Sequence, residues 1–101
     1  MIRMVDELPQ SFAADPRIAG AQYGSVLAVR ADGAIDAADM AGFLTEQVSE
    51  DVFSVAMMSL GIVAKDLLCV GVERRAVESF LVAAMNAYRD HFISRSSGKA
   101  N

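Results

Sequence analysis

Three aspartates lie close together in the sequence and are the clearest candidates for chemistry. Asp32, Asp36 and Asp39 all belong to the string ADGAIDAADM. Carboxylate oxygens are the ligands that calcium and magnesium prefer, so these side chains form a weak candidate for a divalent-metal site. Helix capping accounts for the same residues, because glycine favours a turn after a helix and aspartate caps the next one. We therefore expect a turn at residues 32–33, a helix capped by Asp36, and no resident metal or cofactor.

The same string is similar to two known arrangements. Its Asp-Gly-x-Ile core resembles the second half of an EF-hand calcium loop, but Ala28 and Arg30 then stand where the first two carboxylate ligands are needed. A functional EF-hand is therefore not expected. The string also resembles the turn between two helices of TerB-like helical domains, which are associated with tellurite resistance. That resemblance implies a helical bundle with this turn between two of its helices.

The other reactive side chains are isolated in the sequence. His91 is the only histidine and Cys69 the only cysteine, so the chain alone cannot supply a closed zinc site or an internal disulfide. Asp90 precedes His91 but points about 100° away on a helix, which does not suit a catalytic triad. Glycine-rich phosphate loops and metalloprotease motifs are absent from the sequence. We therefore predict a protein that is not an enzyme.

Length and charge restrict the organisation and the partners. The 101 residues suit one domain, predicted over residues 1–93, with a polar, disordered tail over 94–101. The net charge is −4 without a basic run, which argues against nucleic-acid binding. The acidic start lacks the pattern of a signal peptide, and the uncharged stretch 52–64 is shorter than the ~20 residues that span a bilayer. We expect a cytoplasmic protein that binds neither nucleic acid nor membrane.

Start signals and apolar spacing predict an all-α fold, a compact bundle of four to five helices. Asp15 followed by Pro16 is a strong start signal, and Ser49 followed by two acids is another. An α+β fold with a short strand pair around residues 22–35 is the alternative. The last helix carries one clear apolar face, formed by Val77, Leu81, Ala84, Tyr88 and Phe92. The expected helices cover residues 2–14, 17–31, 36–48, 52–70 and 73–93.

The expected helix over residues 52–70 is apolar on two sides. One broad stripe, which includes Phe53, Met57 and Leu60, suits the core. A second stripe consists of Val55, Met58, Ile62 and Cys69. A helix that is apolar on two sides is either central in its fold or shared with another chain. We predict that this second stripe binds a protein partner.

These features favour a small non-enzymatic helical interaction protein, such as an adaptor, a chaperone or a regulator. Hydrophobic residues make up 53% of the chain, which is high for a domain with so little interior. Self-association as a homodimer would bury part of this excess, and an unidentified protein partner would do the same. The alternative is a divalent-metal-sensing or TerB-like helical domain that uses the acidic residues 32–39.

Overall fold

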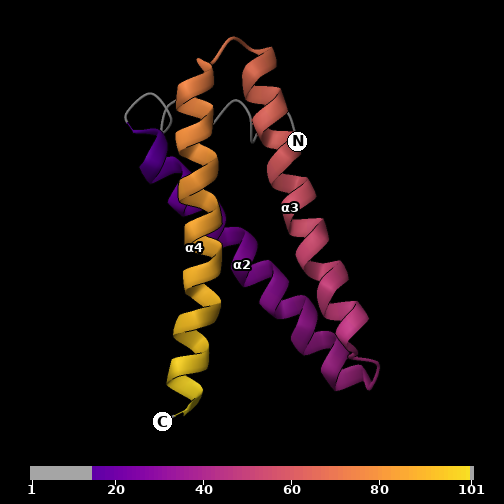
Figure 1. Cartoon of the computed structure of the whole chain (residues 1–101). Coiled ribbons are helices and arrows are strands. Elements are labelled where there is room, and N and C mark those ends of the chain that lie inside the picture. The colour runs from indigo at the N-terminus through magenta and orange to yellow at the C-terminus, as the bar shows by residue number, and fades with distance from the viewer. Residues whose placement is uncertain (1–14, 101) are drawn as a thin grey trace.

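The computed structural model describes residues 15–100, and side chains as far as residue 95, as three α-helices (Figure 1). Helix α2 covers Pro16–Ala41, α3 covers Glu46–Cys69 and α4 covers Arg74–Ala100. The all-α class is therefore confirmed. The alternative of a strand pair at residues 22–35 is wrong, because that segment is helical. The described part of the chain has three helices rather than the predicted four to five. The helix predicted over residues 2–14 lies outside the described residues.

Helix α2 begins as its sequence predicts. Asp15 is the N-cap, and its side chain accepts a hydrogen bond of 2.9 Å from the backbone N–H of Arg17. Pro16 occupies the first turn, where its missing N–H costs nothing. At the other end Gly42 adopts a left-handed conformation with φ 83°, and its N–H bonds back to the carbonyl of Asp39. Glycine tolerates that conformation without steric cost and so terminates the helix.

The turn predicted at residues 32–33 is wrong, because α2 continues through both residues without interruption. Gly33 lies on the exposed side of the helix, where a Cβ atom would meet nothing within 4 Å. The alanines around it favour helix, and the buried Ala28, Ala31 and Ala38 gain further from packing. Packing of this face outweighs the roughly 1 kcal/mol that one glycine costs inside a helix. Asp36 is therefore an internal residue of α2 and not a cap.

Helix α3 starts before the predicted position. Its N-cap is Thr45, whose Oγ1 accepts a hydrogen bond of 3.1 Å from the backbone N–H of Val48. Ser49, the predicted cap, lies inside the first turns of the helix. A threonine followed by Glu46 satisfies the free N–H groups and the positive end of the helix as well as Ser49 would. The predicted end holds, since α3 stops at Cys69 and Gly71 follows with φ 96°.

Helix α4 begins at Arg74 and runs beyond the predicted end near Ile93, as far as Ala100. Position 93 was therefore wrong as a helix end. The predicted division into a domain over 1–93 and a disordered tail over 94–101 stays a prediction. The predicted inner face of α4 is largely buried, and Phe80, which the prediction left out, is fully buried with it.

The tightest packing joins α2 to α4. The two helices cross at Gly20 and Gly24, whose missing side chains let the backbone of α4 approach. A Cβ at Gly20 would collide with the carbonyl oxygen of Phe80, and one at Gly24 with the carbonyl oxygen of Ala84. Most of the contact between helices is made by this pair, and α3 contributes much less.

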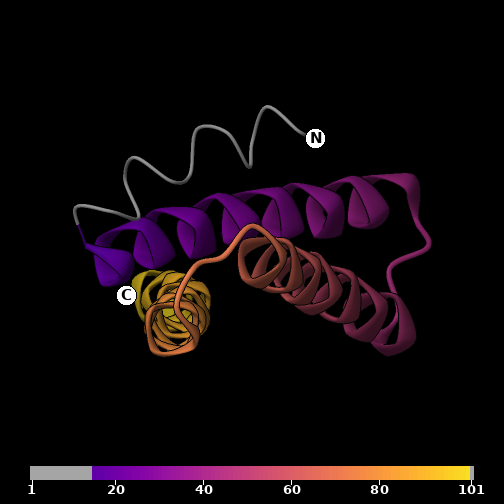
Figure 2. The same cartoon turned by 90° about the horizontal axis from the view of Figure 1, so that it is seen from above.

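Two layers result from this packing. Figure 2 shows α2 as one layer, with α3 and α4 side by side in the other. Helices α3 and α4 meet at the turn between them and diverge away from it, and α2 crosses behind α4 and ends beside the start of α3 (Figure 1). The core lies between the layers and consists mainly of small and aliphatic side chains around Phe80.

Candidate functional site

The residues predicted to bind a partner are exposed in the structure. Val55 is 61% exposed, Met58 64% and Ile62 56%, and the thiol of Cys69 is also exposed. The core-facing residues of α3 lie on its opposite side, because the buried Leu60 and Leu67 are about half a turn away from Ile62 and Cys69. We call Val55, Met58, Ile62 and Cys69 the outer face of α3. The structure leaves this face without a covering element among the described residues.

The middle of α3 carries no charge over residues 52–64, and its charged residues lie near the two ends. The helix has 24 residues, and length and composition alone would allow it to cross a membrane. Only 28% of its most apolar window is buried in the structure. A helix that served only as the core of this fold would be mostly buried. The exposed remainder of α3 is therefore a surface that favours contact with something other than water.

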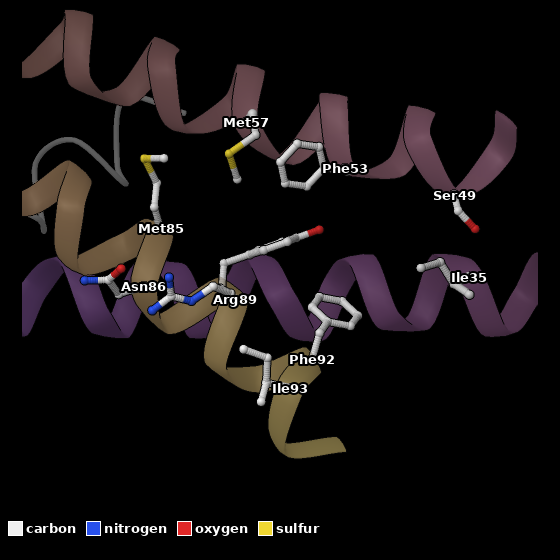
Figure 3. Close-up of a pocket in the computed structure, with 10 residues that line it drawn as sticks. Ile35, Ser49, Phe53, Met57, Met85, Asn86, Arg89, Phe92 and Ile93 are labelled. Carbon is white, nitrogen blue, oxygen red and sulfur yellow. The ribbon is translucent and has the colours of Figure 1, made fainter. Parts of the chain in front are cut away.

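A second apolar surface lies where α3 and α4 diverge. A groove of about 790 Å³ runs between them, with Ile35 of α2 at its base. Phe53 and Met57 enter it from α3, and Met85 and Ile93 enter it from α4 (Figure 3). The sequence prediction included Tyr88 and Phe92, which line the groove, in the inner face of α4, but it missed Met85 and Ile93. The signal was available, because Met85 and Ile93 are eight residues apart, close to two helical turns, and lie outside the predicted inner face.

Aromatic rings from both α3 and α4 line the groove. The ring of Tyr88 lies 5.9 Å from that of Phe53 in an edge-on arrangement and 5.1 Å from that of Phe92. Burial raises the pKa of the Tyr88 hydroxyl above its ordinary value of 10.0. The polar side chains that line the groove are Ser49, Asn86 and Arg89. This lining suits an apolar side chain or ligand with few polar contacts.

Asp32, the first of the three weak candidates for a metal ligand, is instead part of an ion-pair cluster. Asp32 lies 3.2 Å from Nε2 of His91 and also contacts the guanidinium group of Arg95. Arg95 extends further to Asp36, at 3.5 Å. The Asp32 side chain is only 18% exposed. An imidazole and a guanidinium group from α4 therefore face Asp32, and the positive charge of Arg95 makes this carboxylate a poor ligand for a cation.

The three aspartates line one cavity together with Arg95, but they are not arranged as a metal site. Asp32 faces α4, Asp36 is paired with Arg95 at the surface, and Asp39 is exposed further along α2. The described residues contain no group of three or more metal-binding side chains. The helix predicted over residues 73–93 would place His91 near its end, but α4 continues past it to Ala100. In the structure, His91 links α4 to α2 through its contact with Asp32.

No protein-family model, curated protein or solved structure matches this chain. The resemblance of residues 31–40 to TerB-like domains depended on a turn between two helices. Those residues belong to the single helix α2, so the feature that carried the resemblance is absent. The surfaces of the chain itself are therefore the evidence for its function.

Proposed function

We propose that this chain is a small non-enzymatic interaction protein that binds another protein chain through the outer face of α3, and that it does so as a homodimer. The observation that supports the proposal most directly is the exposure of Val55, Met58 and Ile62 on one side of a helix with an uncharged centre. Contiguous exposed apolar side chains of this kind mark interaction surfaces in soluble proteins.

A protein surface fits α3 better than a bilayer does. The charged residues near the ends of α3 are mainly acidic, with Glu46, Glu50 and Asp51 at its start. Membrane surfaces carry negative charge and attract clusters of basic residues, which α3 lacks. The inner side of α3 also packs on α2 and α4 through Leu60, and insertion into a bilayer would remove that contact.

The test is the molar mass in solution, measured by size-exclusion chromatography with light scattering over a dilution series. The wild-type chain should form a dimer, and Ile62→Asp should weaken it. Burying an isoleucine fully is worth about 1.5–3 kcal/mol, so a half-exposed one that becomes covered contributes about 1–2 kcal/mol. Because a dimer contains the position twice, the dissociation constant should rise by roughly 30-fold or more.

Val29→Asp is the matched control, because Val29 is similarly exposed, at 60%, but lies on α2. It should leave the dimer unchanged. A wild-type chain that stays monomeric at every concentration, or equal effects of the two substitutions, would contradict the proposal. Flotation of the chain with lipid vesicles, abolished by Ile62→Asp, would assign the outer face of α3 to a membrane instead.

A further inference from the structure

We propose that the second copy pairs its own α3 with this one in antiparallel orientation, with Met58 of both copies at the two-fold axis. The inference deepens the proposed function and rests on it. It names which surface of the second copy is used, and in which register. The positions of charged and apolar side chains along α3 support this pairing.

Two opposite charges lie at equal distances from Met58. Asp51 is seven residues before it (58 − 51) and Lys65 is seven residues after it (65 − 58). Seven residues are close to two helical turns, or about 10 Å, so both charges lie within about 20° of Met58 around the helix. Both are exposed, and Lys65 makes no ion pair with any described residue of its own chain.

An antiparallel pair centred on Met58 places each Asp51 opposite the Lys65 of the other copy. The dimer would then contain two such ion pairs, one on each side of the two-fold axis. A parallel pair in register would place each charge opposite its own copy, which is repulsive at both positions. Self-complementarity of this kind is what an isologous two-fold interface requires. The charges therefore favour the antiparallel orientation.

The apolar side chains fit the same register. On one edge of the pair, Val55 of each copy would pack against Ile62 of the other, since both lie on the same side of Met58 around the helix. On the other edge, Ser54 would lie beside Gly61 of the second copy. Gly61 has open space around the position of a Cβ atom, so its surface is free for a close approach. One edge is thus filled by branched side chains, and the other lets the two backbones come near.

The test uses two charge reversals. Asp51→Lys alone would place lysines opposite each other, and Lys65→Glu alone would place acids opposite each other. Each variant should dimerise roughly tenfold or more weakly than the wild type, because both ion pairs are replaced by like charges. An equimolar mixture of the two variants should form a heterodimer with near wild-type affinity, since every facing pair is then opposite in sign. Asp39→Lys and Arg75→Glu, exposed charge reversals outside α3, serve as controls and should change nothing.

The readout is analytical ultracentrifugation at 50 mM and 500 mM NaCl, with one variant labelled by a fluorophore. High salt should lessen the defect of each single variant, because it screens exposed charges. If Ile62→Asp abolishes the dimer while both charge reversals leave it intact, the outer face self-associates in another register and this inference is wrong. If the wild-type chain is monomeric throughout, the proposed homodimer itself is wrong.

Discussion

Replacing Gly24 by alanine tests the packing of α2 against α4. The added methyl group would collide with the carbonyl oxygen of Ala84, and the carbonyl carbon and Cα of the same residue lie close behind it. These are backbone atoms of a helix, so no side-chain rotation relieves the contact. The two helices would have to separate along their main interface. We expect Gly24→Ala to destabilise the chain.

The magnitude follows from two opposing effects. Overpacking a well-packed site costs about 1–3 kcal/mol, and more where the backbone itself must move. Alanine regains up to about 1 kcal/mol because it favours helix over glycine. A net loss of about 2 kcal/mol corresponds to a fall of roughly 8–16 °C in the melting temperature of a domain of this size.

Gly33→Ala is the matched control. It lies in the same helix and makes the same chemical change, so its effect on the unfolded chain is nearly equal. A Cβ at Gly33 would meet nothing within 4 Å. This variant should therefore gain about 0.5–1 kcal/mol. The two variants should move the free energy of unfolding in opposite directions.

The assay is urea and thermal unfolding followed by far-ultraviolet circular dichroism, at one protein concentration for all variants. Equal concentration matters because a dimer's stability depends on it. A Gly24→Ala protein as stable as Gly33→Ala would show that α2 and α4 do not approach at this position. The crossing described above would then be wrong.

Three further predictions concern single side chains. Asp32→Ala should lower the free energy of unfolding in urea by about 1–2 kcal/mol, because it removes the contacts of α2 with His91 and Arg95 of α4. Asp39→Ala, at an exposed site, should lower it by less than about 0.5 kcal/mol. Equal losses would contradict a stabilising role for the Asp32 contacts. Thr45→Ala should lower stability by about 1 kcal/mol through loss of the α3 cap, and Ser49→Ala should not, which thermal melts would distinguish. Burial raises the pKa of Tyr88, so the protonated phenol is favoured in the folded state. The stability that this preference contributes is complete below pH 10 and is lost as the pH rises above that value. Tyr88→Phe should therefore lose less stability than the wild type between pH 9 and pH 12, as measured by thermal melts.

Local signals in the sequence determined the helical class and several helix ends. Asp15 and Pro16 start α2 as predicted, and Gly71 follows the end of α3, because capping depends on hydrogen bonds between residues a few positions apart. The side of α3 that carries Val55, Met58 and Ile62 also followed from periodicity alone. A stripe that is opposite the core-facing stripe on a helical wheel is opposite it in the structure.

The tertiary structure decided where those local signals are overruled. Asp32 and Gly33 have the chemistry of a turn, yet they continue α2 because the alanine and glycine face beside them packs against α4. Asp32 has the chemistry of a metal ligand, yet it faces His91 and Arg95, which are 59 or more residues away in the chain. The groove between α3 and α4 exists only because the two helices diverge. Such outcomes depend on contacts between distant segments, and no window of local sequence contains them.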